Sequence, residues 1–134
     1  MRASVLLLLA AGPLAAQSSL ADAAEQARRA WLAHDVDALV AHSPSLVLQI
    51  PGADPSSPLV RAQAAELLKR YFRPAEERAV EVRTVREVEP GRGFVELERR
   101  YVVSGTSDER RETVFLGFQF RYGRWVLAEL RGGA

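Results

Sequence analysis

The chain has 134 residues, of which 48% are hydrophobic and 26% are charged, with 18 basic and 17 acidic side chains. These values are typical of one globular domain and do not fit a fibrous, wholly disordered or membrane-embedded chain. Cysteine is absent, which excludes disulfides, thiolate catalysis and cysteine-ligated metals.

The first sixteen residues have the pattern of a secretory signal peptide. Met1-Arg2 supplies a positive charge, and the apolar run "ASVLLLLAAGPLAA" follows. That run is shorter than the roughly 20 apolar residues that span a membrane, and its leucine-rich centre and small-residue exit are typical of an export signal. A buried N-terminal helix is the alternative. We expect cleavage after Ala16, a single domain at residues 17–134, and an unanchored periplasmic or extracellular product.

Charge argues against nucleic-acid binding. Removal of residues 1–16 takes away Arg2 and no acid, which leaves 17 basic and 17 acidic side chains. Nucleic-acid-binding surfaces normally carry a clustered basic excess. Here the pairs Arg28-Arg29, Arg99-Arg100 and Arg110-Arg111 all have acids close by, so we expect solvated charged faces.

Two helices are predicted before the first strand. Ser19 and Asp22 have capping-box spacing, and apolar residues then recur with helical period, which predicts a helix over about 19–33. Asp35 is suited to cap a second short helix in "VDALVAH". His34 lies at the reversal between the helices, where a left-handed backbone is often needed.

The remaining chain predicts one strand, one helix and a four-stranded meander. "SLVLQI" alternates as a strand does, residues 51–58 are a loop by composition, and "RAQAAELLKRYF" has helical spacing. From residue 78 onward the apolar period is two, and three turns join four strands at residues 89–93, 105–108 and Gly123-Arg124. The order ααβαββββ favours an α+β fold with helices gathered on one face of an antiparallel sheet.

This order of elements resembles the nuclear-transport-factor-2-like, or SnoaL-like, superfamily. The likeness is carried by "AWLAHDVDALVAH", "RAQAAELLKRYF" and "GRWVLAELR" and covers about residues 19–131. It implies a cystatin-like cone in which a curved antiparallel sheet wraps around the N-terminal helices. Within the superfamily the chain is most similar to small exported bacterial domains of unknown function.

The histidines and aspartates near residue 35 are interpreted as a structural joint. A metal site needs several converging ligands, whereas capping turns Asp35 back to the backbone. In the proteins that this chain resembles, the same stretch joins two helices. No catalytic, metal-binding or cofactor-binding residue is assigned, and no cofactor is expected.

Enzymes of the superfamily, such as ketosteroid isomerases and epoxide hydrolases, place acids, tyrosines or histidines inside the cone. Strand alternation puts Arg99 on the apolar face, where it would clamp a carboxylate ligand or pair with Glu129 inside the protein. The candidate pocket residues are Trp31, Tyr71, Leu97, Arg99, Tyr101, Phe118 and Glu129.

Three functions remain open. The first is an exported, non-catalytic domain that binds a small apolar or amphipathic ligand or a protein partner. The second is an isomerase, dehydratase or cyclase with its site inside the cone, and the third is an accessory structural module of an envelope complex. The strand "TVFLGFQF" is apolar on one face and partly apolar on the other, which favours a homodimer through the outer sheet face.

Overall fold

The computed structural model describes residues 19–133, so the predicted signal peptide lies outside the described part. Within these residues no helix is long and apolar enough to cross a membrane. The elements follow in the order α2 (Leu20–Leu32), α3 (Val36–Leu39), β1 (Ser45–Gln49), β2 (Leu59–Val60), α4 (Arg61–Phe72), β3 (Ala75–Glu89), β4 (Arg92–Val103), β5 (Glu109–Arg121) and β6 (Arg124–Gly132).

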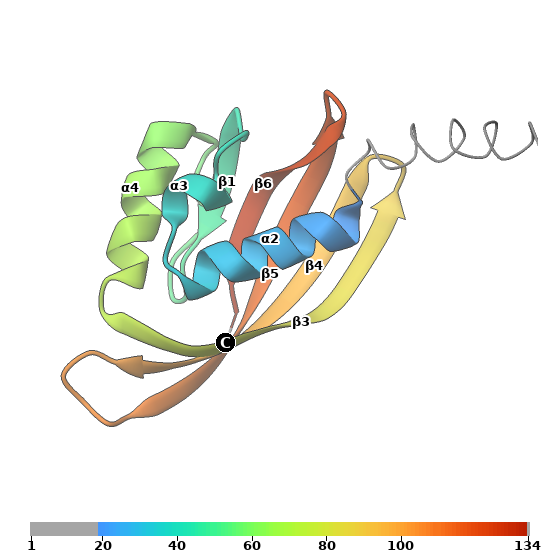
Figure 1. Cartoon of the computed structure of the whole chain (residues 1–134). Helices are drawn as coiled ribbons and strands as arrows, with labels where there is room; N and C mark the ends of the chain where they lie inside the picture. Colours follow the sequence, from blue (N-terminus) through green and yellow to red (C-terminus); the bar gives the residue numbers. More distant parts are fainter. Residues whose placement is uncertain (1–18, 134) are drawn as a thin grey trace, which may run out of the picture.

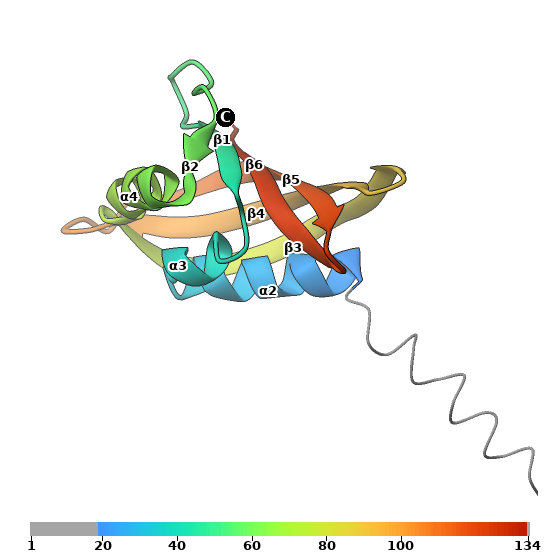
Figure 2. The same cartoon turned by 90° about the horizontal axis from the view of Figure 1, so that it is seen from above.

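The strands form one curved sheet in the order β2-β1-β6-β5-β4-β3. Helix α2 lies along one face of this sheet, and α4 lies at one end of it (Figures 1 and 2). The predicted four-stranded antiparallel meander is confirmed as β3 to β6. Two features were not predicted: β1 pairs in parallel with β6, and the two-residue strand β2 extends the sheet beyond β1.

The start of α2 and the joint between α2 and α3 both have the predicted geometry. The Ser19 side chain accepts a hydrogen bond from the Asp22 backbone N–H over 3.0 Å, and the Asp35 side chain accepts one from the Ala38 N–H over 3.1 Å. His34 between them has a φ of 55°, the left-handed conformation that allows the chain to reverse. The predicted caps by the Ser19 hydroxyl and the Asp35 carboxylate are confirmed.

The last hairpin turns one residue earlier than predicted. Arg121 pairs with Arg124 across the hairpin, so the turn is made by Tyr122 and Gly123, and Arg124 is already the first residue of β6. Both turn residues have positive φ, 53° and 80°, as the tight turn that matches strand twist requires. Left-handed backbone is uncommon at a tyrosine, so the sequence does not mark Tyr122 as a turn residue.

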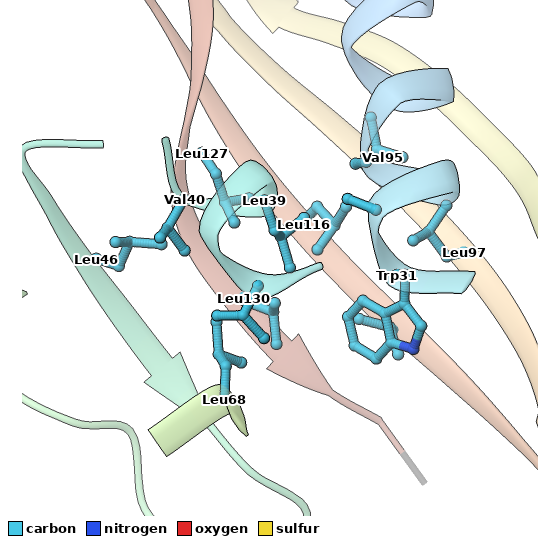
Figure 3. Close-up of a cluster of buried hydrophobic side chains, with 14 of the residues drawn as sticks. Trp31, Leu39, Val40, Leu46, Leu68, Val95, Leu97, Leu116, Leu127 and Leu130 are labelled. Carbon is cyan, nitrogen blue, oxygen red and sulfur yellow. The ribbon is translucent and has the colours of Figure 1, made fainter. Parts of the chain in front are cut away.

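The core lies between the helices and the concave face of the sheet (Figure 3). Trp31 of α2 is fully buried there, with its ring centroid 4.7 Å from that of Phe72. The cluster also takes alternate residues from the strands, because every second strand residue faces the helices. Its labelled members in Figure 3 are Trp31, Leu39, Val40, Leu46, Leu68, Val95, Leu97, Leu116, Leu127 and Leu130.

The opposite face of the sheet carries an aromatic pair. Phe94 and Phe115 are stacked with their ring centroids 5.8 Å apart. The guanidinium carbon of Arg86 lies 5.8 Å from the Phe94 ring, and that of Arg131 lies 5.8 Å from the Phe115 ring. Side chains of the same chain therefore cover part of this apolar surface.

Candidate functional site

An arginine is buried inside the fold among charged and polar partners. Arg99 of β4 has a side chain that is only 2% exposed. Its Nε and Nη2 donate to the two carboxylate oxygens of Glu77, the first over 3.0 Å. Its Nη1 donates to Glu112 over 3.0 Å and to the Tyr71 hydroxyl over 3.1 Å. These four residues, with His34, are called the buried ion cluster.

Aromatic rings surround the guanidinium of this cluster. Its central carbon lies 3.9 Å from the ring centroid of Tyr101 and 5.4 Å from those of Trp31 and Tyr71. Rings at these distances attract a cation, and the attraction is stronger where water is excluded. Arg99 is therefore held by ion pairs and by ring faces at the same time.

The two carboxylates reach the cluster in different ways. Glu112 of β5 lies two residues before Val114 and so shares its inward-facing parity, a signal that the sequence does contain. The β3–β4 ladder has an irregularity between Glu77 and Ala79. It shifts the inward-outward alternation by one residue, so that Glu77 and the buried Val80 face the same side of the sheet although they are three residues apart. Sequence alternation alone therefore does not indicate that Glu77 points inward.

His34 has a second role besides the helix joint. Its Nε2 lies 3.0 Å from Glu77 Oε2, and it donates the hydrogen bond because a carboxylate only accepts. The imidazole is stacked on Phe72 with a centroid separation of 4.8 Å, and 27% of its side chain is exposed. The joint thus places a polar ring at the edge of the buried ion cluster.

Tyr71 connects α4 to this cluster. Its hydroxyl donates to Glu112 and accepts from Arg99. Burial, together with the hydrogen bond to Glu112, raises the pKa of Tyr71 well above its ordinary value of 10.0. The neutral phenol is therefore the form that the folded protein favours.

Alkaline pH should destabilise the protein through Tyr71. Above pH 10 the unfolded tyrosine loses its proton while the folded one keeps it, so the free energy of unfolding should fall by about 1.4 kcal/mol per pH unit on this account. Urea unfolding at pH 9, 10 and 11 measures the fall. Tyr71→Phe should show a shallower fall over the same range, and equal slopes in the two proteins would contradict the assignment.

The structure brings four of the seven candidate pocket residues together. Trp31, Tyr71, Arg99 and Tyr101 meet at the buried ion cluster. The partners of Arg99 are the two carboxylates described above, so the arginine is enclosed by this chain's own side chains.

The other three candidates lie elsewhere. Leu97 is a fully buried core residue, and Phe118 lines a separate groove. Glu129 lies on the outer face of the sheet, opposite Gly117 and 3.3 Å from Arg131. The internal pair of Arg99 with Glu129 does not form, because the two side chains project from opposite faces of the sheet.

A groove lies between the first half of α2, the end of α3 and the β5–β6 hairpin, and we call it the hairpin groove. Its deeper part is a hollow of about 260 Å³, here called the apolar hollow. Polar contributions come from Gln26, His42 and Ser43. The apolar walls are formed by Ala23, Ala27, Ala38, Leu39, Ala41, Phe118, Trp125, Val126 and Leu127.

The outer part of the hairpin groove has a different character. A hollow of about 340 Å³, here called the arginine hollow, is lined by His42, Pro44, Arg61, Arg121, Tyr122, Arg124 and Val126. A third hollow of about 320 Å³ shares Gln26 and Trp125 with the apolar hollow, and Tyr122 and Arg124 with the arginine hollow. His42 lines all three, so they form one continuous surface.

Sequence reasoning missed the hairpin groove. His42 entered the argument only as a distant companion of His34, and no periodicity relates it to Arg61 or Arg124. Three separate segments of the chain form the groove, and their proximity follows from the parallel pairing of β1 with β6, which was not predicted. Among residues 19–133, no group of three or more His, Asp or Glu side chains is placed to hold a metal ion.

The sequence matches no protein-family model and no curated protein, but solved structures match the fold. A ketosteroid isomerase-like protein from Erwinia carotovora atroseptica has a TM-score of 0.69 at 18% identity, over 85% of this chain and 92% of that one. A DUF4783 family protein from Bacteroides ovatus has a TM-score of 0.66 at 11% identity, over 81% and 91%.

A further match is an NTF-2 like protein of unknown function from Shewanella oneidensis, with a TM-score of 0.61 at 12% identity over 85% and 95% of the two chains. Identities this low concern architecture and leave activity open. The curved sheet and the N-terminal helices of this chain nevertheless agree with these neighbours along most of their length. The chain therefore has the nuclear-transport-factor-2-like fold that its sequence resembles.

Proposed function

We propose that this protein is an exported, non-catalytic domain that binds a small amphipathic molecule in the hairpin groove. The observation that carries the proposal is the uneven distribution of charge along one continuous groove. Arg121 and Arg124 line its outer part, whereas no arginine lines its deeper part, which is walled by residues such as Ala23, Phe118 and Trp125. Sites for small ligands are typically concave, mainly apolar and marked by a few polar groups that fix orientation.

The buried ion cluster supports a groove site over a site inside the cone. Arg99 already donates four hydrogen bonds to Glu77, Glu112 and Tyr71. A ligand that replaced either carboxylate would leave a buried charge without a partner, which is strongly unfavourable. The cluster is therefore best understood as structural.

The isomerase, dehydratase or cyclase alternative has less support. That alternative places Arg99, Tyr101 or Glu129 in a catalytic pocket. Glu129 lies on the outer face of the sheet, and Arg99 is already paired with Glu77 and Glu112. The resemblance to a ketosteroid isomerase-like protein concerns the fold.

Protein partners and homodimerisation stay predictions, as does the role of an accessory module in an envelope complex. The outer sheet face with Phe94 and Phe115 is the surface we would assign to a second copy. Size-exclusion chromatography with light scattering, run at high protein concentration, measures the oligomeric state directly. A strictly monomeric protein would contradict the homodimer prediction and would leave the proposed groove site unaffected.

Tryptophan fluorescence tests the proposed function. The chain has two tryptophans: Trp125 lines the hairpin groove, and Trp31 is buried in the core. Titration with 1-octanol and octanoate, two amphipathic probes with the same chain length, should change the emission in a saturable way. Trp31→Phe should keep the response because Trp125 reports it, and Trp125→Phe should lose it.

The two variants serve as matched controls, since each retains one tryptophan. A response that disappears in Trp31→Phe and persists in Trp125→Phe would place the ligand in the core. No saturable response to either probe, in emission or in calorimetry, would contradict the proposed function.

A further inference from the structure

The arginine hollow concentrates positive charge without a compensating acid. Arg61, Arg121 and Arg124 line it together with His42, and no Asp or Glu does. Among the residues that the structure describes, none of these three arginines forms an ion pair within 4 Å. Equal numbers of acids and bases follow residue 16, so this grouping is a local feature and does not reflect a basic protein.

Neutral acceptors hold two of these arginines in place. Arg61 Nε donates to the backbone oxygen of Ser43 over 3.1 Å, and Arg121 Nε donates to Gln119 Oε1 over 3.0 Å. In both cases the terminal Nη groups remain for another acceptor. Guanidinium groups match carboxylate and phosphate oxygens in a planar, two-bond geometry.

The start of helix α4 also favours an anion at this place. Helix α4 begins at Arg61 without a side-chain cap, and the positive end of its dipole adds to the charge of the arginines. Tyr122 at the hairpin tip is 97% exposed and has a φ of 53°. A non-glycine residue is uncommon in that conformation, and here it places an aromatic ring at the rim of the arginine hollow.

We propose that the arginine hollow binds the anionic head of an amphipathic ligand, a carboxylate or a phosphate monoester, while the apolar tail lies in the apolar hollow. The inference rests on the proposed function, because it assigns a chemical class to the ligand of the same groove. The two parts of the ligand match the two ends of the groove. Charge selects the head, and burial of the tail supplies the non-directional part of the affinity.

Four probes with the same eight-carbon tail separate the contributions: octanoate, octyl phosphate, 1-octanol and octylammonium, titrated at pH 7 and low ionic strength. Octanoate and octyl phosphate should bind at least ~10-fold more tightly than octanol, and octylammonium should bind most weakly. The preference should shrink at high salt because the arginines are solvent-exposed. The ratio of octanoate to octyl phosphate affinity shows which head the hollow prefers.

The double variant Arg121→Gln/Arg124→Gln leaves only Arg61 of the three arginines, so it should remove most of the preference for anions by weakening octanoate and octyl phosphate binding far more than octanol binding. The matched control is Arg70→Gln/Arg73→Gln, which removes the same charge from exposed positions at the opposite end of α4 and should keep the preference. Equal affinity for octanol and octanoate in the unmodified protein would overturn this inference while leaving the proposed function intact. Failure of all four probes to bind would overturn both.

Discussion

Replacement of Arg99 by methionine is expected to lower the free energy of unfolding by about 3–5 kcal/mol. The substitution leaves the carboxylates of Glu77 and Glu112 buried without their cationic partner; their side chains are 2% and 9% exposed. Methionine fills a similar volume, so the loss reflects unpaired charge more than an empty space. Urea unfolding followed by circular dichroism at pH 7 measures the change.

The control replaces the whole ion pair network. In Glu77→Leu/Arg99→Met/Glu112→Leu no buried charge remains, and the stability should return to within about 2 kcal/mol of the unmodified protein or exceed it. A loss below about 1 kcal/mol in Arg99→Met alone would contradict the interpretation. It would mean that water reaches the cluster and screens its charges.

Truncation of Trp31 is the second change with a large expected effect. Trp31→Ala should cost about 3–5 kcal/mol of unfolding free energy, because it removes a fully buried indole that packs between α2 and the aromatic residues of α4. It also takes away one of the ring faces that surround Arg99. Thermal and urea unfolding both measure this loss.

Trp31→Phe should be much milder, and the reason lies in the indole nitrogen. Trp31 Nε1 is buried and has no hydrogen-bond partner, an arrangement that costs on the order of 1–3 kcal/mol. Phenylalanine gives up some packing area and removes that unpaired donor, so the two effects should partly cancel. If Trp31→Phe lowered the free energy of unfolding as much as Trp31→Ala does, the expected partial cancellation would be wrong.

Local signals made the architecture predictable. The caps at Ser19 and Asp35, the reversal at His34 and the period-two strands each depend on neighbouring residues, and the structure confirms them. The turn at Tyr122-Gly123 was placed one residue late, because left-handed backbone at a tyrosine has no clear sequence signal. Pairing of β1 with β6 joins residues that are far apart in the chain, and short-range patterns do not encode such contacts.

The site was less predictable than the fold, for geometric reasons. Alternation along β4 placed Arg99 inside, and the same rule along β5 would have placed Glu112 beside it. Glu77 faces inward through a ladder irregularity that no composition signal marks. The hairpin groove brings His42 together with Arg124 only because β1 and β6 are neighbours.

The central claim is that a ligand enters the hairpin groove and leaves the buried ion cluster intact. A titration of the ¹⁵N-labelled protein with octanoate, followed by two-dimensional NMR, tests it most directly. We expect the largest shifts at the Trp125 indole and at the backbone amides of His42 and Arg124, with the Trp31 indole nearly unchanged. The largest shifts at Trp31 and Tyr101, with Trp125 and His42 unaffected, would contradict the account.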